Sequence, residues 1–279
     1  MKIRTLLFVC ASIAVASCAQ TPEEKLAAYE QAHDALMLEY RTTMDSLSAD
    51  RQKAEAYYEE FVPRYVEFNL GAAKENADNK VAVEALMNLR GLVTDAQVEE
   101  VIALMSEEML ADEGVASLKK GLDARKATAE GMKYTDFTVE HVYGYDRSMD
   151  PQPLKKEVKF SEYVGNGKYV LVDFWSPWCR PCCQEMPNVK TVYEQYKDKG
   201  LEVVSLTVWE RKPQSHTIEK AAELGMDWTV ITNCGNVPTD IYGVEGIPHL
   251  MLIGPDGTIL KRGFHGLEGI RAAVAEYIK

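Results

Sequence analysis

The first half of the chain carries apolar residues at the three- and four-residue spacing of amphipathic helices. One stripe, which predicts a first helix, consists of Leu26, Tyr29, His33, Leu36, Tyr40, Met44 and Leu47. A second stripe consists of Ala54, Tyr57, Phe61, Tyr65 and Phe68. Pro63 falls within this second stripe and is expected to kink or split its helix. We interpret His33 and the aromatic residues of both stripes as packed core residues rather than a cofactor site.

Three shorter helices are predicted before residue 131. Asn79 can cap the first of them, which stops at Gly91. Thr94 and Gln97 have the spacing of a capping box and begin the next. The last ends near Gly131. These segments share no fixed repeat length, so the pattern predicts an irregular all-α domain rather than a solenoid.

Beyond about residue 134, short β-rich runs alternate with helical stretches. The predicted strands cover 136–139, 158–160, 169–175, 201–208, 248–253 and 258–262, and the predicted helices about 182–199, 216–224 and 267–278. The first two runs are expected to be edge strands, and Tyr169–Trp175 the central strand. The pattern predicts an α/β domain over 134–279, with a mixed sheet covered by helices on both faces, and an all-α domain over 18–133.

The chain begins like a secretory signal. Lys2 and Arg4 precede an apolar stretch that is shorter than the ~20 residues needed to span a bilayer. The sequence that ends at Cys18 resembles the lipobox of bacterial lipoproteins, which implies a signal peptide over 1–17 and a lipid on Cys18. Ordinary signal-peptidase cleavage is the alternative. Ala19 after the cysteine, in place of Asp, favours the outer membrane over the inner, with the catalytic domain facing the periplasm.

Charge and cysteine content narrow the functional classes. The formal net charge of the 279 residues is −12, and no basic stripe is present, so nucleic acid is not an expected partner. Of the six cysteines, Cys10 lies in the signal peptide and Cys18 would carry the lipid. Cys183 is expected to pack as a small apolar side chain, and Cys234 to lie in a loop. The sequence leaves open a bridge between these last two.

The remaining cysteines form a C-x-x-C motif, Cys179 and Cys182, in a context typical of a redox centre. The buried strand precedes Trp178, and the motif itself opens a helix. Backbone N–H groups and the helix dipole stabilise a thiolate at such a position, where cysteine pKa values fall from about 8.5 to roughly 3.5–7.5. Cys179, nearer the helix start, is expected to attack, and Cys182 to resolve the mixed disulfide. Trp178 is expected to shield the pair.

One charge interrupts the central strand. Asp173 is not expected there for packing alone, because carboxylates are seldom fully buried without a role. Burial would raise its pKa and make it a proton acceptor for Cys182 through water. The alternative is a solvent-exposed carboxylate at the end of the strand.

Residues from about 134 to 279 resemble thioredoxin-like thiol-disulfide oxidoreductases of the TlpA/ResA type. The motifs that carry this resemblance are Tyr169–Trp175, Trp178-Cys179-Arg180-Pro181-Cys182, Glu185-Met186-Pro187, Tyr242-Gly243-Val244-Glu245-Gly246-Ile247-Pro248 and Ile253-Gly254-Pro255-Asp256-Gly257. The resemblance implies an α/β thioredoxin fold for this domain, with Asp173 as the family's buried acid and Pro248 as its cis-proline. The backbone of Ile247 would then pair with the substrate chain.

The resemblance also implies partners. It implies a reductase that needs no cofactor, acts on disulfides of envelope proteins such as apocytochrome c, and is re-reduced by a membrane electron donor. The motif alone does not set the direction of electron flow, because thioredoxin-type pairs span roughly −270 to −120 mV. The helical segment before residue 131 resembles the linker helices of longer lipoproteins of this type and implies no activity.

Three other functions were considered. Cys179, Cys183 and His249 could form the copper site of a metallochaperone on the same fold, although Pro248 disfavours metal binding there. A peroxiredoxin is excluded by spacing, because Pro177 lies two residues before Cys179 instead of seven. An adhesion or scaffold role of the acidic helical domain is neither favoured nor excluded. We therefore expect a disulfide oxidoreductase with no bound metal.

Overall fold

The computed structural model describes residues 20–279, which fall into two compact units that divide between Val115 and Ala116. The predicted signal peptide over 1–17 and the predicted lipid site at Cys18 lie outside the described residues. No helix within 20–279 combines the length and the apolar character needed to cross a membrane. The predicted division into two domains at 133/134 is a statement about which segments fold independently, and it stays a prediction.

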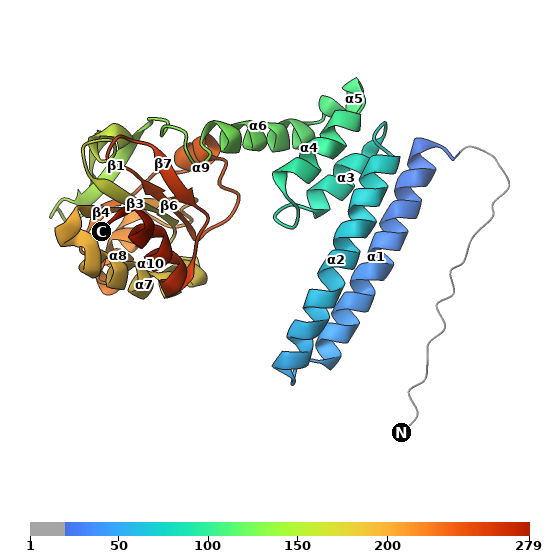
Figure 1. The fold of residues 1–279 in the computed structure, drawn as a ribbon, viewed down its shortest axis with the longest axis horizontal. Coiled ribbons are helices and arrows are strands. Elements are labelled where there is room, and N and C mark those ends of the chain that lie inside the picture. Colours follow the sequence, from blue (N-terminus) through green and yellow to red (C-terminus); the bar gives the residue numbers. More distant parts are fainter. Residues whose placement is uncertain (1–19) are drawn as a thin grey trace. The chain divides into compact units, whose positions relative to one another are not determined.

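The first unit begins with two long helices, α1 (Pro22–Ser46) and α2 (Arg51–Glu75), which lie side by side (Figure 1). The predicted aromatic stripes face each other, and the rings of Tyr40 and Phe61 are 4.5 Å apart. Helix α2 continues through Pro63 and is not split there. His33 packs in this interface, with Nε2 3.0 Å from the Tyr65 hydroxyl, as expected of a core histidine.

Three further helices complete the unit: α3 (Lys80–Asn88), α4 (Asp95–Leu104) and the short α5 (Glu107–Leu110). The predicted caps are confirmed, because the Asn79 side chain accepts from the N–H of Val81, and Thr94 and Gln97 form a capping box. Helix α3 supplies much of the core with apolar side chains, namely Val81, Ala82, Ala85 and Leu86. The next helix, α6 (Glu113–Ala127), runs across the division between the units.

The second unit contains a five-stranded sheet in the order β5-β4-β3-β6-β7. Its strands are β3 (Tyr169–Trp175), β4 (Leu201–Thr207), β5 (Thr229–Ile231), β6 (His249–Ile253) and β7 (Ile259–Arg262). Strand β3 is central, parallel to β4 and antiparallel to β6, so the predicted mixed sheet is confirmed. Strand β5 was not predicted, because three residues carry too little periodicity.

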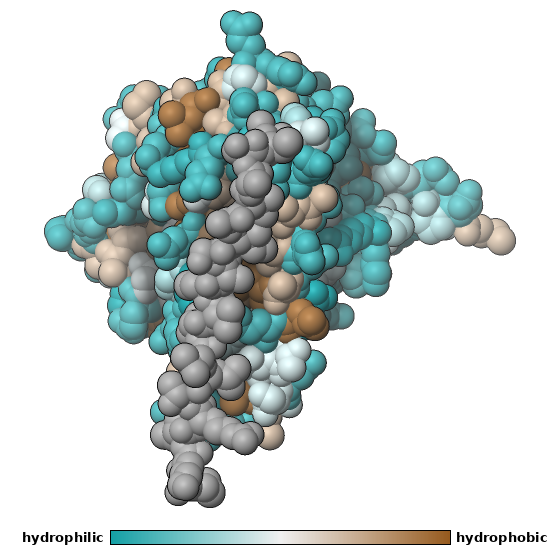
Figure 2. Space-filling view, turned by 90° about the vertical axis from the view of Figure 1, so that its right-hand side faces the viewer, coloured by the Kyte–Doolittle hydropathy of each residue, from teal (hydrophilic) through white to brown (hydrophobic). Residues whose placement is uncertain are grey.

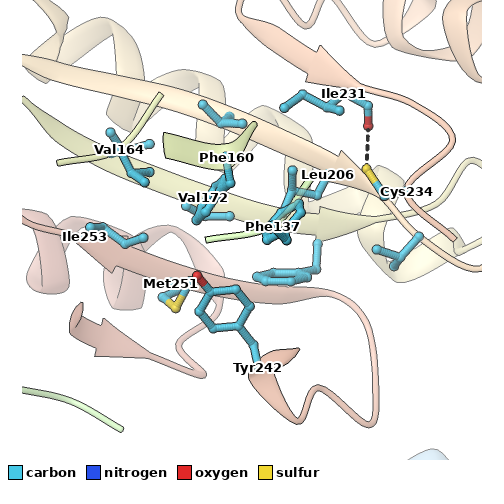
Figure 3. Packing of buried hydrophobic residues seen from close by; sticks show 14 of the residues in the cluster. Phe137, Phe160, Val164, Val172, Leu206, Ile231, Cys234, Tyr242, Met251 and Ile253 are labelled. Carbon is cyan, nitrogen blue, oxygen red and sulfur yellow. Dashed lines mark hydrogen bonds between the residues drawn. The ribbon is translucent and has the colours of Figure 1, made fainter. Parts of the chain in front are cut away.

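The expectation that the first two β-runs are edge strands of this sheet is wrong. Strands β1 (Thr138–Tyr145) and β2 (Pro153–Lys159) pair with each other in a separate two-stranded ribbon. Val139 and Val158 are buried while most of their neighbours are exposed, so the ribbon has one apolar face. That face packs in a cluster with residues of the central strand (Figure 3). Packing by its face leaves the ribbon outside the hydrogen-bonded sheet.

Helices cover both faces of the sheet. Leu171 packs with α7 (Arg180–Tyr196) and α10 (Gly266–Tyr277). The alternate residues of β3 point to the opposite face, towards the ribbon and the buried Tyr242 of α9 (Val237–Tyr242). The other elements are α8 (Gln214–Glu223) and two short 3-10 helices, Phe160–Glu162 and Lys197–Lys199. The predicted thioredoxin-like α/β fold, preceded by helices, is therefore confirmed. The coloured face in Figure 2 is mostly hydrophilic, with small scattered apolar patches.

Candidate active site

The C-x-x-C motif lies where the central strand passes into α7. Cys179 is the N-cap residue of α7, and Cys182 lies in its first turn. The two sulfur atoms form a disulfide, with the Cα atoms 5.3 Å apart. Cys182 is completely buried, whereas Cys179 keeps 4% of its surface exposed. Of the two cysteines, only Cys179 therefore keeps any surface towards which a substrate could approach.

Two backbone groups contact the sulfur of Cys179. The N–H of Cys182 donates to Cys179 Sγ over 3.2 Å. The carbonyl oxygen of Ile247 lies 3.7 Å from the same sulfur. The peptide bond between Ile247 and Pro248 is cis. When the disulfide is reduced, the donated N–H and the positive end of the α7 dipole stabilise a thiolate on Cys179.

Asp173 is fully buried in the middle of the sheet, so the alternative of a solvent-exposed carboxylate does not hold. The Ser205 hydroxyl donates to Asp173 Oδ2 over 2.9 Å, and the indole N–H of Trp228 donates to Ser205 Oγ over 2.9 Å. Asp173 Oδ1 has no hydrogen-bond partner within residues 20–279. Burial raises the pKa of Asp173 to about 7; the charge of Glu185 acts in the same direction, and the bond from Ser205 opposes it.

Glu185 is not a freely solvated charge. Its Oε1 atom accepts from the N–H of Gly266 over 2.9 Å, at the first residue of α10. The side chain of Asn188 donates to the same atom over 3.1 Å. A carboxylate at a helix N-terminus is favoured by the helix dipole. Glu185 thus joins α7 to α10, and its charge raises the pKa of Asp173.

Trp178 forms the exposed rim of the site, with 36% of its surface accessible. Its indole N–H donates to the carbonyl oxygen of Trp209 over 2.8 Å. The guanidinium carbon of Arg211 lies 3.8 Å from the centre of a Trp178 ring. Sequence reasoning missed Trp209 and Arg211, because no local pattern connects them to the motif. It also missed Ser205, whose only signal is a lone hydroxyl in an apolar strand.

Comparisons with known proteins place this site in a family. A model of the AhpC/TSA family matches residues 131–262. Thiol-disulfide oxidoreductase ResA of Bacillus subtilis (strain 168) is 28% identical over 137 residues, which are 49% of this chain and 68% of the relative. ResA of Bacillus thuringiensis subsp. konkukian (strain 97-27) is 31% identical over 124 residues, which are 44% of this chain and 68% of the relative. The chain belongs to the ResA family of thiol-disulfide oxidoreductases.

A solved structure also resembles this ResA-family chain. It is the thioredoxin domain of a thiol-disulfide oxidoreductase from Bacteroides vulgatus, at 24% identity and a TM-score of 0.44. The match covers 54% of this chain and 99% of that domain.

The two other cysteines of the ResA-family domain are free thiols, so the bridge between Cys183 and Cys234 that the sequence left open is not formed. Cys234 is buried in the core and lies 3.3 Å from the carbonyl oxygen of Ile231 (Figure 3). Cys183 lies 3.7 Å from the carbonyl oxygen of Pro177. Burial raises the pKa of both thiols, which disfavours the reactive thiolate.

The copper-site alternative gains no support from the structure. Within residues 20–279, no group of three or more His, Cys, Asp or Glu side chains is arranged to hold a metal ion. Cys179 is bonded to Cys182 instead of standing beside Cys183. His249 packs edge-on against Phe174, and burial lowers its pKa to about 3, with the positive charge of Arg262 acting in the same direction.

Proposed function

We propose that this oxidoreductase reduces disulfides of protein substrates in the cell envelope. The observation that carries the proposal is the position of Cys179, which is the more accessible sulfur and accepts the N–H of Cys182 at the start of α7. These features favour a Cys179 thiolate that attacks a substrate disulfide when the enzyme is in its dithiol form. The family membership establishes thiol-disulfide exchange, and the reductive direction is the proposed part.

The proposed reaction has two exchange steps. The Cys179 thiolate attacks one sulfur of the substrate disulfide, forms a mixed disulfide and releases the other sulfur as a thiolate. Cys182 then loses its proton and attacks Cys179, which forms the internal disulfide and releases the second substrate thiolate. Two electrons pass from the enzyme dithiol to the substrate, and a membrane electron donor restores the dithiol.

Other site residues assist these steps in our proposal. Asp173, the buried acid with a pKa raised to about 7, accepts the proton of Cys182 through water. The backbone of Ile247, whose carbonyl oxygen is near Cys179, pairs with the substrate chain, and Pro248 fixes that backbone. Trp178 contributes an exposed aromatic surface beside the sulfur pair for the substrate to pack against.

The reduction potential tests the direction. The Cys179–Cys182 couple is equilibrated with glutathione buffers, and the thiol fraction is measured by alkylation and mass spectrometry. We expect a value below about −200 mV, towards the reducing end of the thioredoxin-type range. A potential near −120 mV, together with faster oxidation of dithiols than reduction of disulfides, would contradict the proposal. The variant with both motif cysteines replaced by serine is the control for other thiols.

We further propose a lipid anchor on Cys18, which holds the enzyme on the periplasmic side of the outer membrane. Small residues before Cys18 and the uncharged Ala19 after it support this proposal. Envelope proteins such as apocytochrome c, whose haem-site cysteines must be reduced, are the proposed substrates. Cells fed a clickable fatty acid should label the wild-type protein and not Cys18→Ser. Equal labelling of both would contradict the anchor.

A further inference from the structure

The loop that follows β4 has an unusual backbone. Trp209 has φ +52° and Asn233 has φ +63°, and they are the two non-glycine residues with positive φ within 20–279. Asn adopts this conformation readily, whereas a bulky side chain does so only at an energetic cost. Such strained residues gather at functional sites. Trp209 is the residue whose carbonyl oxygen holds the Trp178 indole beside the disulfide.

Several hydrogen bonds hold this loop in place. The N–H of Trp209 donates to the carbonyl oxygen of Gly235 over 3.2 Å. The carboxylate of Glu210 accepts from the N–H of Asn233 over 2.6 Å, and burial raises the pKa of Glu210. The side chain of Gln214 donates to Asn233 Oδ1 over 3.0 Å. The loop that carries Arg211 is therefore braced against the loop after β5.

The braced loop presents the guanidinium of Arg211. The group stacks on Trp178, with 3.8 Å between the guanidinium carbon and the ring centre. Within residues 20–279, the Arg211 side chain has no ion pair and no hydrogen bond, so its N–H groups remain available to a ligand. Exposed Arg180 directly follows Cys179 and adds a second positive charge next to the motif. Stacking pre-orients the planar group and lowers the entropy lost when it binds an anion.

We propose that Arg211 binds a carboxylate of the protein substrate close to the reacting cysteine, so that disulfides flanked by Asp or Glu are preferred. A guanidinium offers two parallel N–H groups that match a carboxylate. Trp178, on which the guanidinium stacks, immediately precedes Cys179 in the chain, so a carboxylate bound to Arg211 would lie near the disulfide. This inference rests on the proposed attack by Cys179 on protein disulfides.

The test uses the reduced full-length protein and three peptide disulfides that differ only in the residues beside the cysteine, Glu, Gln or Lys. Both peptide ends are blocked, so that only side-chain carboxylates are tested. We expect kcat/KM to fall in the order Glu, Gln, Lys, with about three- to tenfold between Glu and Gln. The difference should shrink in 0.5 M salt, which shortens the screening length.

Variants assign this preference to one residue. Arg211→Gln should remove the advantage of the Glu peptide, and Arg211→Glu should reverse the order. Lys212→Gln removes the same charge from the neighbouring exposed residue and should leave the preference intact. Lys212→Gln should reduce hydroxyethyl disulfide, a small neutral substrate, at the wild-type rate. The rate of each Arg211 variant on each peptide is divided by its rate on this neutral substrate, so that a general loss of activity is separated from a loss of preference.

Two results would overturn the inference. One is an equal loss for all three peptides and for hydroxyethyl disulfide in Arg211→Gln, which would show that Arg211 only supports Trp178. The other is an equal loss of preference in Lys212→Gln, which would show that the preference comes from the general positive charge of this surface and not from Arg211. If the enzyme proves to be an oxidant, the proposed direction fails separately. The same ranking is then expected for oxidation of the corresponding dithiol peptides, and its absence there would overturn the inference.

Discussion

Ser205 donates a hydrogen bond of 2.9 Å to the buried carboxylate of Asp173, its register partner on the adjacent parallel strand. The bond satisfies one carboxylate oxygen and leaves the other without a partner among the described residues. A single neutral donor does not compensate for burial of a charge. Burial therefore raises the pKa of Asp173 to about 7.

This shift predicts how Asp173→Asn changes stability with pH. In wild type, the unfolded chain releases the Asp173 proton near pH 4 while the folded chain keeps it until about pH 7. The unfolding free energy of wild type should therefore fall as pH rises between these values, and the variant should lose this dependence. The unfolding free energy of the variant minus that of wild type should be roughly 4 kcal/mol larger at pH 8 than at pH 3. Urea unfolding of both oxidised proteins measures this, and a difference independent of pH would contradict the shift.

The two cysteines should behave differently when replaced singly. Cys179→Ala should lose disulfide reduction, because the attacking sulfur is absent. Cys182→Ala should accumulate mixed disulfides with substrates, because attack by Cys179 survives and resolution does not. Non-reducing gels and mass spectrometry of captured species provide the measurement. Capture by Cys179→Ala but not by Cys182→Ala would reverse the two roles.

Gly243 should tolerate no side chain. Its φ is +60°, and an added Cβ would lie 2.6 Å from the carbonyl oxygen of Gly121 in α6. Gly243→Ala should destabilise the protein by about 3 kcal/mol or more, since conformational strain of 1–2 kcal/mol adds to a backbone clash. Gly235→Ala is the matched control, because its φ is +56° and nothing lies within 4 Å of the added Cβ. Thermal unfolding showing equal losses for both variants would refute the close contact with α6.

Tyr242 should contribute through its hydroxyl and its ring separately. The hydroxyl donates a hydrogen bond to the carbonyl oxygen of Thr135 over 2.7 Å. It also accepts one from the backbone N–H of Thr135 over 3.2 Å. The fully buried ring packs with Phe160 and Phe174. Tyr242→Phe should cost about 1–2 kcal/mol, for the lost hydrogen bonds. Tyr242→Ala should cost about 3–5 kcal/mol, because it also leaves a cavity. Equal unfolding free energies for the two variants would show that the ring packing contributes little.

The sequence by itself determined the features that depend on near neighbours. The apolar run that ends at Trp175 and the helical stretch that follows the motif place Cys179 and Cys182 at the start of α7. The caps at Asn79 and Thr94 follow from side-chain bonds that reach two or three residues along the chain. The run Tyr169–Trp175 is apolar on both faces except at Asp173, which predicted a buried central strand with a charge inside it.

Only the tertiary structure decided which distant residues meet. Strand register brings Ser205 to Asp173, and the strained conformation at Trp209 brings Arg211 onto Trp178. The ribbon of β1 and β2 likewise packs by its face, although its sequence resembles that of an edge strand. A polar or apolar pattern shows which side of an element is buried, but not which partner covers it. That choice depends on the packing of the whole domain, where contacts far apart in sequence form together.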